Sequence, residues 1–122
     1  MQLNEITHKI IGCAYEVANQ LGVGFLEKVY ENALCIELSK QGLIAQQQKI
    51  IDVYYKEILV GEYVADLLVE DLVIVELKAL ERLRGIHQAQ LMNYLKATNN
   101  RYGLLINFGN PRVEMKRIVH GY

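Results

Sequence analysis

The sequence predicts an α/β fold, in which a mixed β-sheet is flanked by helices in the order α-α-β-β-β-α-β-β. Two helical patterns of apolar residues come first, β-branched and aromatic residues dominate the middle of the chain, and a third helical pattern separates two later apolar strands. At 122 residues, 52% of them hydrophobic, the chain is long enough to bury one core. We therefore expect residues 1–122 to form a single domain.

The helices are predicted from apolar side chains spaced three or four residues apart. They are expected at residues 4–21, 25–41 and 86–98. Gly22 and Gly42 directly follow the first two patterns, and Asn99 follows the third; glycine and asparagine are the usual residues just after a helix ends. These stop signals give the helices their expected lengths.

Five segments have the composition of β-strands. They are expected at residues 43–55, 58–69, 72–77, 102–108 and 113–119. The segment 72–77 is almost continuously apolar, as expected of a central strand covered on both faces. Gly61 is a candidate β-bulge, and the last segment alternates like a more exposed strand. The predicted sheet thus has a buried centre and an exposed edge.

Charge and cysteine content restrict the class of protein. The formal net charge is −1, so a site for a polyanion has to be local. Cys13 and Cys35 lie in helical patterns without metal-type spacing and are expected to be free thiols. Charged residues within the first apolar pattern exclude a signal peptide and a membrane span there. We expect a cytoplasmic protein without a membrane partner.

Three charged residues interrupt the apolar strands between Val64 and Lys78: Asp66, Glu76 and Lys78. A carboxylate inside an apolar strand is costly unless it is paired, hydrogen-bonded or bound to a metal. Glu76 and Lys78 share a strand face because they are two residues apart. An aspartate opposite Glu-x-Lys can hold a divalent cation beside a phosphodiester.

This interpretation places a condition on the turn between the two strands. A strict two-residue hairpin at Glu70-Asp71 would set Asp66 opposite Val75 and turn Glu76 to the other face. A shared metal therefore requires a three-residue turn, Glu70-Asp71-Leu72, or a bulge.

With these motifs placed, the chain resembles the GxxExxY proteins, a branch of the PD-(D/E)XK nuclease superfamily. The resemblance rests on GFLEKVY at residues 24–30, ADLLVED at 65–71, VIVELKAL at 73–80, IHQAQLMNYLKAT at 86–98 and GLLINFG at 103–109. It covers almost the whole chain and implies a restriction-endonuclease-like core with a metal-dependent nuclease site. Because one fold can host several functions, the resemblance transfers the fold more safely than the activity.

The site residues follow from the resemblance together with the chemistry. Asp66, Glu76 and the Leu77 carbonyl are the expected ligands of Mg²⁺, for which Mn²⁺ can substitute. Lys78 is expected to orient the attacking water or to neutralise developing charge; the alternative is a structural ion pair with an acid. Glu27 is the expected third acid, although a first-turn acid also favours a helix dipole.

The remaining site residues are expected to contact the substrate. Gln90 is expected to bond the acids or the substrate, and Tyr94, one helical turn further, to contact a nucleotide. Arg82 and Arg84 are expected to contact phosphates, or else to form a solvated surface. His87 is also a candidate for substrate contact, and the alternative is that it is simply a surface or core residue of the helix.

The predicted function is a Mg²⁺-dependent nuclease that hydrolyses phosphodiester bonds in DNA, or less readily RNA, in DNA repair or defence. The alternative is a non-catalytic nucleic-acid or protein-binding module that keeps the fold and uses its acids structurally. A homodimer would combine two of the Arg82–Arg84 loops on one nucleic acid.

Overall fold

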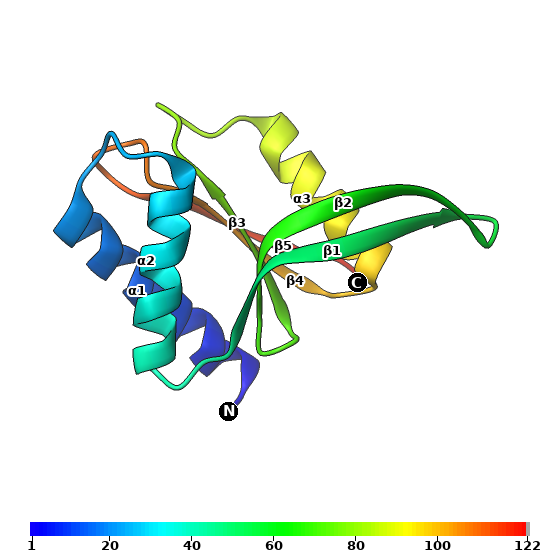
Figure 1. Cartoon of the computed structure of the whole chain (residues 1–122), viewed down its shortest axis with the longest axis horizontal. Helices are drawn as coiled ribbons and strands as arrows, with labels where there is room; N and C mark the ends of the chain where they lie inside the picture. Colours follow the sequence, from blue (N-terminus) through cyan, green and yellow to red (C-terminus); the bar gives the residue numbers. More distant parts are fainter. Residues whose placement is uncertain (122) are drawn as a thin grey trace.

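The computed structural model, which describes residues 1–121, confirms the predicted order of elements (Figure 1). Its helices are α1 (Leu3–Leu21), α2 (Glu27–Lys40) and α3 (Gly85–Thr98); its strands are β1 (Ala45–Tyr55), β2 (Ile58–Val69), β3 (Val73–Lys78), β4 (Tyr102–Asn107) and β5 (Glu114–Val119). The start predicted for the second helix at Phe25 is too early, because Leu26 is extended, with φ −72° and ψ 155°. The other bounds differ from prediction by one or two residues, which is the usual uncertainty of helix and strand ends.

The strands form a mixed sheet in the order β1-β2-β3-β4-β5. Only β3 and β4 are parallel among the paired strands of residues 1–121, and α3 connects them. Their register pairs Lys78 with Asn107, so the carboxyl ends of both strands meet at one edge of the sheet. β3 is the central strand, as its apolar sequence predicts, and all its residues except Lys78 are buried.

Helices cover the two faces of this sheet unequally. Two helices, α1 and α2, pack on one face, whereas α3 alone packs on the other (Figure 1). The first core takes its largest side chains from Ile6, Ile10, Tyr30, Leu34, Leu38, Leu67, Leu77 and Phe108. The second core is smaller and includes Ile51, Leu68, Ile74, Leu91, Tyr94 and Leu95. The α3 face is therefore the less completely covered one.

β1 and β2 form a long hairpin that extends past the rest of the sheet (Figure 1). Lys56 and Glu57 make its two-residue turn and have φ values of 47° and 70°, the left-handed pair typical of a type I′ turn. The register shifts where Val53 faces Gly61 and Tyr54 faces Leu59, which confirms the bulge predicted at Gly61. Apolar side chains near the tip of this hairpin are exposed.

The turn between β2 and β3 contains three residues, because Val69 pairs with Val73. Glu70 and Asp71 adopt φ values of 54° and 55°, and the Leu72 amide donates to the Val69 carbonyl at 3.0 Å. The three-residue turn that a metal shared by Asp66 and Glu76 requires is thus present. Continued by one residue, this register puts Asp66 opposite Glu76.

A second polar cluster fixes the loop that follows β3. We call it the amide cluster: the Asn107 side chain with the groups that it bonds. Asn107 Oδ1 accepts from the amides of Leu80 and Gly109, and Asn107 Nδ2 donates to the Leu80 carbonyl and to Glu114 Oε1. The loop also crosses Gly109 closely, since a Cβ there would lie 2.2 Å from the Leu80 carbonyl oxygen. No helix within residues 1–121 has the length and apolar character needed to cross a membrane.

Candidate active site at the fork of β2 and β3

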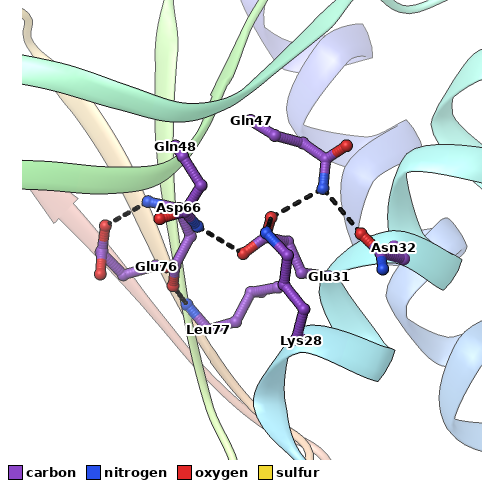
Figure 2. A network of polar contacts seen from close by, with 8 residues as sticks. All are labelled: Lys28, Glu31, Asn32, Gln47, Gln48, Asp66, Glu76 and Leu77. Carbon is purple, nitrogen blue, oxygen red and sulfur yellow. Dashed lines mark hydrogen bonds and ion pairs between the residues drawn. The ribbon is translucent and has the colours of Figure 1, made fainter.

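The two acids lie where β2 separates from β3. The paired residues of these strands end at Leu67 and Val75, whereas β3 continues beside β4 as far as Lys78. Beyond the last pair, the Asp66 amide donates to Glu76 Oε1 at 2.8 Å, and the Leu77 amide donates to Asp66 Oδ2 at 2.7 Å (Figure 2). Each carboxylate therefore takes the place of a backbone acceptor, which fixes both side chains across the fork. We call Asp66 and Glu76 the acid pair.

Both carboxyl groups are harder to ionise than usual. Burial and then the charge of Asp66 raise the pKa of Glu76 to about 8, against the smaller effects of the Asp66 amide and Lys78. Burial likewise raises the pKa of Asp66, which the Leu77 amide partly offsets. Burial is thus the main reason why both acids resist ionisation, the charge of Asp66 adds to it at Glu76, and Lys78 offsets these effects only in part.

The Leu77 carbonyl faces the same opening. Lys78 presents its carbonyl oxygen to β4, where the Phe108 amide donates to it at 2.8 Å. Carbonyl directions alternate along a strand, so the carbonyl of Leu77 points toward β2, as its amide does in reaching Asp66. Because the pairing with β2 has ended there, this oxygen lies beside the two carboxylates.

Lys78 lies near the acid pair but forms no ion pair with it. Lys78 is two residues after Glu76 on β3, so the two side chains share a face, and the charge of Lys78 lowers the pKa values of Asp66 and Glu76. Within residues 1–121, the ion pairs closer than 4 Å are Lys28–Glu31 and Lys40–Glu37. The structural ion pair considered as an alternative for Lys78 is thus not formed, and the ammonium is available to another anion.

A buried glutamate that was not predicted, Glu31, flanks the fork from α2. Only 3% of Glu31 is exposed, and its carboxylate accepts from Lys28 Nζ, Gln47 Nε2 and Gln48 Nε2 at 2.7–2.8 Å. The Gln48 side chain also lowers the pKa of Asp66, and it lies between Glu31 and the acid pair (Figure 2). Glu31 precedes Leu34 and Leu38 at helical spacing. An acid within that apolar stripe was the sequence signal that could have identified Glu31 as a buried residue.

Glu27, the predicted third acid, lies at the first residue of α2 and is exposed. Its charge adds a small effect that raises the pKa of Glu76, and it forms no hydrogen bond with either acid among the described residues. Tyr30, in contrast, is wholly buried. Its hydroxyl donates to the Gly22 carbonyl at 2.6 Å, and its ring stacks on Phe108 with a centroid distance of 4.8 Å. The GxxExxY segment therefore supplies one acid to the site and one residue to the core.

Tyr94 and Gln90 meet at a small cavity beside the acid pair. The cavity measures about 180 Å³ and is lined by Tyr63, Ile86, Ala89, Gln90, Asn93 and Tyr94. Burial raises the pKa of the Tyr94 hydroxyl, and the charges of Glu76 and Asp66 raise it further. Tyr94 is thus placed beside the acids, whereas Gln90 forms no hydrogen bond with them among the described residues.

The predicted basic residues gather at a different cavity. Arg82, Arg84 and His87 line an open cavity of about 710 Å³ together with Leu80, Glu81, Ile86 and Asn110, and none of the acid pair lines it. His87 Nδ1 accepts from the Arg84 amide at 3.1 Å, which fixes the start of α3. The cavity lies beside the loop that follows Lys78. Its basic residues are therefore next to the fork, and they do not line the opening that contains Asp66 and Glu76.

The donor set at the fork fits a divalent cation that keeps several waters. Asp66, Glu76 and the Leu77 carbonyl supply hard oxygen atoms, and a cation would relieve the repulsion that raises the pKa values of the acid pair. Glu76 Oε2 accepts no hydrogen bond from the described residues, yet no buried polar side-chain atom among them lacks a partner, so this oxygen is open to solvent. No group of three or more His, Cys, Asp or Glu residues in residues 1–121 could hold a metal by itself.

Comparison with known proteins agrees with this geometry. Residues 4–118 match the sequence profile of a family described as the PD-(D/E)XK nuclease superfamily. The chain belongs to that superfamily. The restriction-endonuclease-like fold expected from the sequence is thereby confirmed. No curated protein matches the sequence.

Two solved structures share the nuclease-type fold with this superfamily member. The crystal structure of SSO0001 has a TM-score of 0.61 and 17% identity, and it covers 78% of this chain. An alkaline exonuclease from Laribacter hongkongensis has a TM-score of 0.52 and 13% identity, covering 88% of this chain and 76% of its own. The chain spans only 50% of the length of SSO0001. At these identities, the likeness extends to the fold.

Proposed function

We propose that the domain is a Mg²⁺-dependent nuclease that hydrolyses phosphodiester bonds in DNA. The observation that carries this proposal is the fork itself: two opposed buried carboxylates, an open carbonyl beside them and a lysine that forms no ion pair within the described part of the chain. A structural network would neutralise its acids within the protein. Here a bound cation would favour ionisation of both buried carboxyl groups, and Lys78 forms no ion pair with any residue among 1–121.

Asp66, Glu76 and the Leu77 carbonyl are the groups that would hold the cation. Bound Mg²⁺, or Mn²⁺ in its place, would lower the pKa of a water and offset charge on the phosphate. The bonds from the Asp66 and Leu77 amides hold the two carboxylates in place before any ion arrives. This preorganisation reduces the rearrangement needed for binding.

Lys78 is the residue for the phosphate. Its side chain shares a strand face with Glu76, and it forms no ion pair with another residue among 1–121. There it would donate to the attacking water or to the phosphate oxygen on which charge develops. Glu27, exposed across the opening, would accept a hydrogen bond from a water on the substrate side.

The remaining predicted residues are assigned to substrate binding. Arg82 and Arg84, in the open cavity beyond β3, would contact phosphates flanking the scissile one. His87, whose Nδ1 is engaged at the start of α3, retains Nε2 for a similar contact. Gln90 and Tyr94 would contact the nucleotide next to the acid pair.

Cleavage of labelled DNA tests the proposal. The wild type in Mn²⁺ or Mg²⁺ should cut single-stranded, duplex or branched DNA, and Lys78→Ala should lose about a thousandfold of that rate, the size of a strong electrostatic contribution. Lys40→Ala is the matched control because Lys40 pairs with Glu37 on an exposed turn of α2. Equal cleavage by the two variants, or no cleavage of any DNA by the wild type, would contradict a nuclease.

Two copies of the chain would place two basic cavities on one substrate. We propose such a homodimer because Tyr54, Tyr55, Ile58, Leu59 and Val60, at the tip of the β1–β2 hairpin, are 50–67% exposed. Surfaces of this kind commonly mark protein contacts. Sedimentation should show a dimer that Ile58→Lys converts to a monomer; a wild-type monomer at all concentrations would exclude it.

We place this activity in the cytoplasm. Cys13 and Cys35 are both free, as predicted, which suits a reducing compartment. Burial raises the pKa values of both thiols and makes them poor nucleophiles. The protein should therefore keep two slowly reacting thiols when purified from that compartment.

A further inference from the structure

The cavity between β2 and α3 has the features of a site for an unpaired nucleobase. Its floor is the Tyr63–Tyr94 ring pair, with a centroid distance of 5.4 Å and an interplanar angle of 37°. Tyr94 is 5% exposed and fixed in the core, whereas Tyr63 is 49% exposed and leaves much of its ring in solvent. A supported, half-exposed tyrosine is the type of surface on which bases stack.

The remaining walls supply apolar contact and hydrogen-bonding capacity. Ile86 is 73% exposed beside the aromatic pair, and Ala89 adds little bulk. The side-chain amides of Gln90 and Asn93 line the same cavity and form no hydrogen bond with other residues among 1–121. Each amide carries both a donor and an acceptor, which is the pattern that can pair with a base edge.

The position of this cavity relates it to the proposed chemistry. Tyr94 lines the cavity and also lies close enough to Asp66 and Glu76 for their charges to act on its hydroxyl. Tyr63 is on β2, three residues before Asp66. A nucleotide with its phosphate at the fork would thus have its base within reach of the rings. A base inside a duplex is stacked on both sides and cannot enter such a cavity without being flipped out.

We propose that Tyr63, Gln90, Asn93 and Tyr94 bind one unpaired base beside the scissile phosphate, so that the substrate is single-stranded nucleic acid or a strand with unpaired nucleotides. This inference rests on the proposed nuclease function and specifies its substrate class. Tyr63 supplies the stacking surface, and the two amides pair with the edge of the base. A cavity of about 180 Å³ admits one base.

Binding measured without cleavage tests this site. Fluorescence anisotropy in EDTA should show that the wild type binds a single-stranded oligonucleotide more tightly than the blunt duplex of the same sequence. Tyr63→Ala should weaken single-strand binding about tenfold, the low end of the range for loss of one stacked base, and leave duplex binding unchanged. Tyr63→Phe, which keeps the ring, should bind like the wild type.

Tyr15→Ala is the matched control, since Tyr15 is a 50% exposed tyrosine on α1, outside this cavity and away from the hairpin tip. The double variant Gln90→Ala/Asn93→Ala should lose preference among homopolymers of different base, because the edge contacts are gone. DNA and RNA strands of one sequence, compared in parallel, separate base recognition from recognition of the ribose hydroxyl.

Three results would overturn the base site. They are equal binding of duplex and single strand, equal loss in Tyr63→Ala and Tyr15→Ala, and a loss in Tyr63→Phe as large as in Tyr63→Ala. Because no metal or cleavage is involved, these results leave the nuclease test standing. Conversely, selective binding by a protein that never cleaves would remove the nuclease function and retain the base site.

Discussion

Two buried polar clusters lie next to each other at the carboxyl ends of β3 and β4, and they are built in opposite ways. In the amide cluster, Asn107 is wholly buried, and both of its side-chain polar atoms have partners. In the acid pair, Asp66 and Glu76 repel each other, and the nearby Lys78 forms no ion pair with either. The amide cluster stabilises a loop, whereas the acid pair lowers the stability of the fold and provides oxygen atoms that can bind a cation. Proteins commonly accept such local cost where they perform chemistry.

The largest effect should come from neutralising the acid pair. Glu76→Gln removes a charged metal ligand, and we expect cleavage to fall by at least about a thousandfold, roughly 4 kcal/mol in the barrier. The same change removes the repulsion with Asp66, so urea unfolding in EDTA at alkaline pH should show equal or greater stability than the wild type. A variant that is both inactive and strongly destabilised would mean that Glu76 is structural.

Adding a methyl group at Gly109, which the loop after β3 crosses closely, should lower the stability of the fold rather than act on the chemistry directly. Gly109→Ala brings a Cβ to 2.2 Å from the Leu80 carbonyl oxygen, a backbone atom that cannot rotate away. We expect a loss of about 3 kcal/mol or more in the free energy of unfolding, the upper range for overpacking. In Gly12→Ala, the added Cβ meets nothing within 4 Å on α1, and this control should gain up to about 1 kcal/mol. Equal stabilities of the two variants would show that the loop does not pack on Gly109.

Removing the amide should leave several backbone groups without partners. Asn107→Leu keeps the volume of the side chain but deprives the Leu80 and Gly109 amides of their acceptor. We expect a loss of about 2 kcal/mol in the free energy of unfolding, measured with urea. A stability equal to that of the wild type would mean that water satisfies these groups and that the amide cluster is dispensable.

The acid pair should also make the metal-free protein sensitive to pH. The raised pKa of Glu76, about 8 against an ordinary 4.5, means that the folded state keeps a proton which the unfolded state has released between these values. The contribution of Glu76 to the free energy of unfolding is therefore fully present below about pH 4.5, and it is lost as the pH rises through about 8. We expect a decrease of at least ~1.4 kcal/mol, the equivalent of one pKa unit.

Urea unfolding in EDTA between pH 5 and pH 9, values that bracket the upper pKa of about 8, measures this decrease. Glu76→Gln is the control, because it has no proton to lose at that position, and its stability should change less over the same interval. Parallel profiles for the two proteins would contradict the raised pKa.

The order of the elements and much of the fork could be predicted from the sequence. Periodicity, strand-type composition and helix stop signals located the helices and strands, and the period-2 rule for strands showed that Asp66 and Glu76 can meet only across a three-residue turn or a bulge. Such rules succeed because burial on one face of a strand fixes its register.

Other parts of the site depended on packing that local patterns do not encode. Glu31 was missed because the exposed Glu27, one turn earlier, has the same residue type, and only the docking of α2 on β1 decides which one is buried. Gln48, which lies between Glu31 and Asp66, has a left-handed backbone with φ 53°. Glycine is the usual residue in that conformation, so a glutamine there gave no sequence signal. Arg82 and Arg84 were expected to contact phosphates, and the cavity that they line, beside the loop held by the amide cluster, is a feature that their sequence pattern does not encode.

The central claim is that the acid pair binds a divalent cation, and a thermal unfolding titration tests it most directly. Addition of Mn²⁺ or Mg²⁺ to EDTA-treated protein at pH 8 should raise Tm with increasing concentration, because an ion that binds only the folded state stabilises it. Asp66→Asn and Glu76→Gln should show little or no rise, whereas Lys78→Ala, which keeps every ligand, should respond like the wild type. A Tm unchanged by either ion in the wild type, or raised equally in Asp66→Asn, would contradict the account.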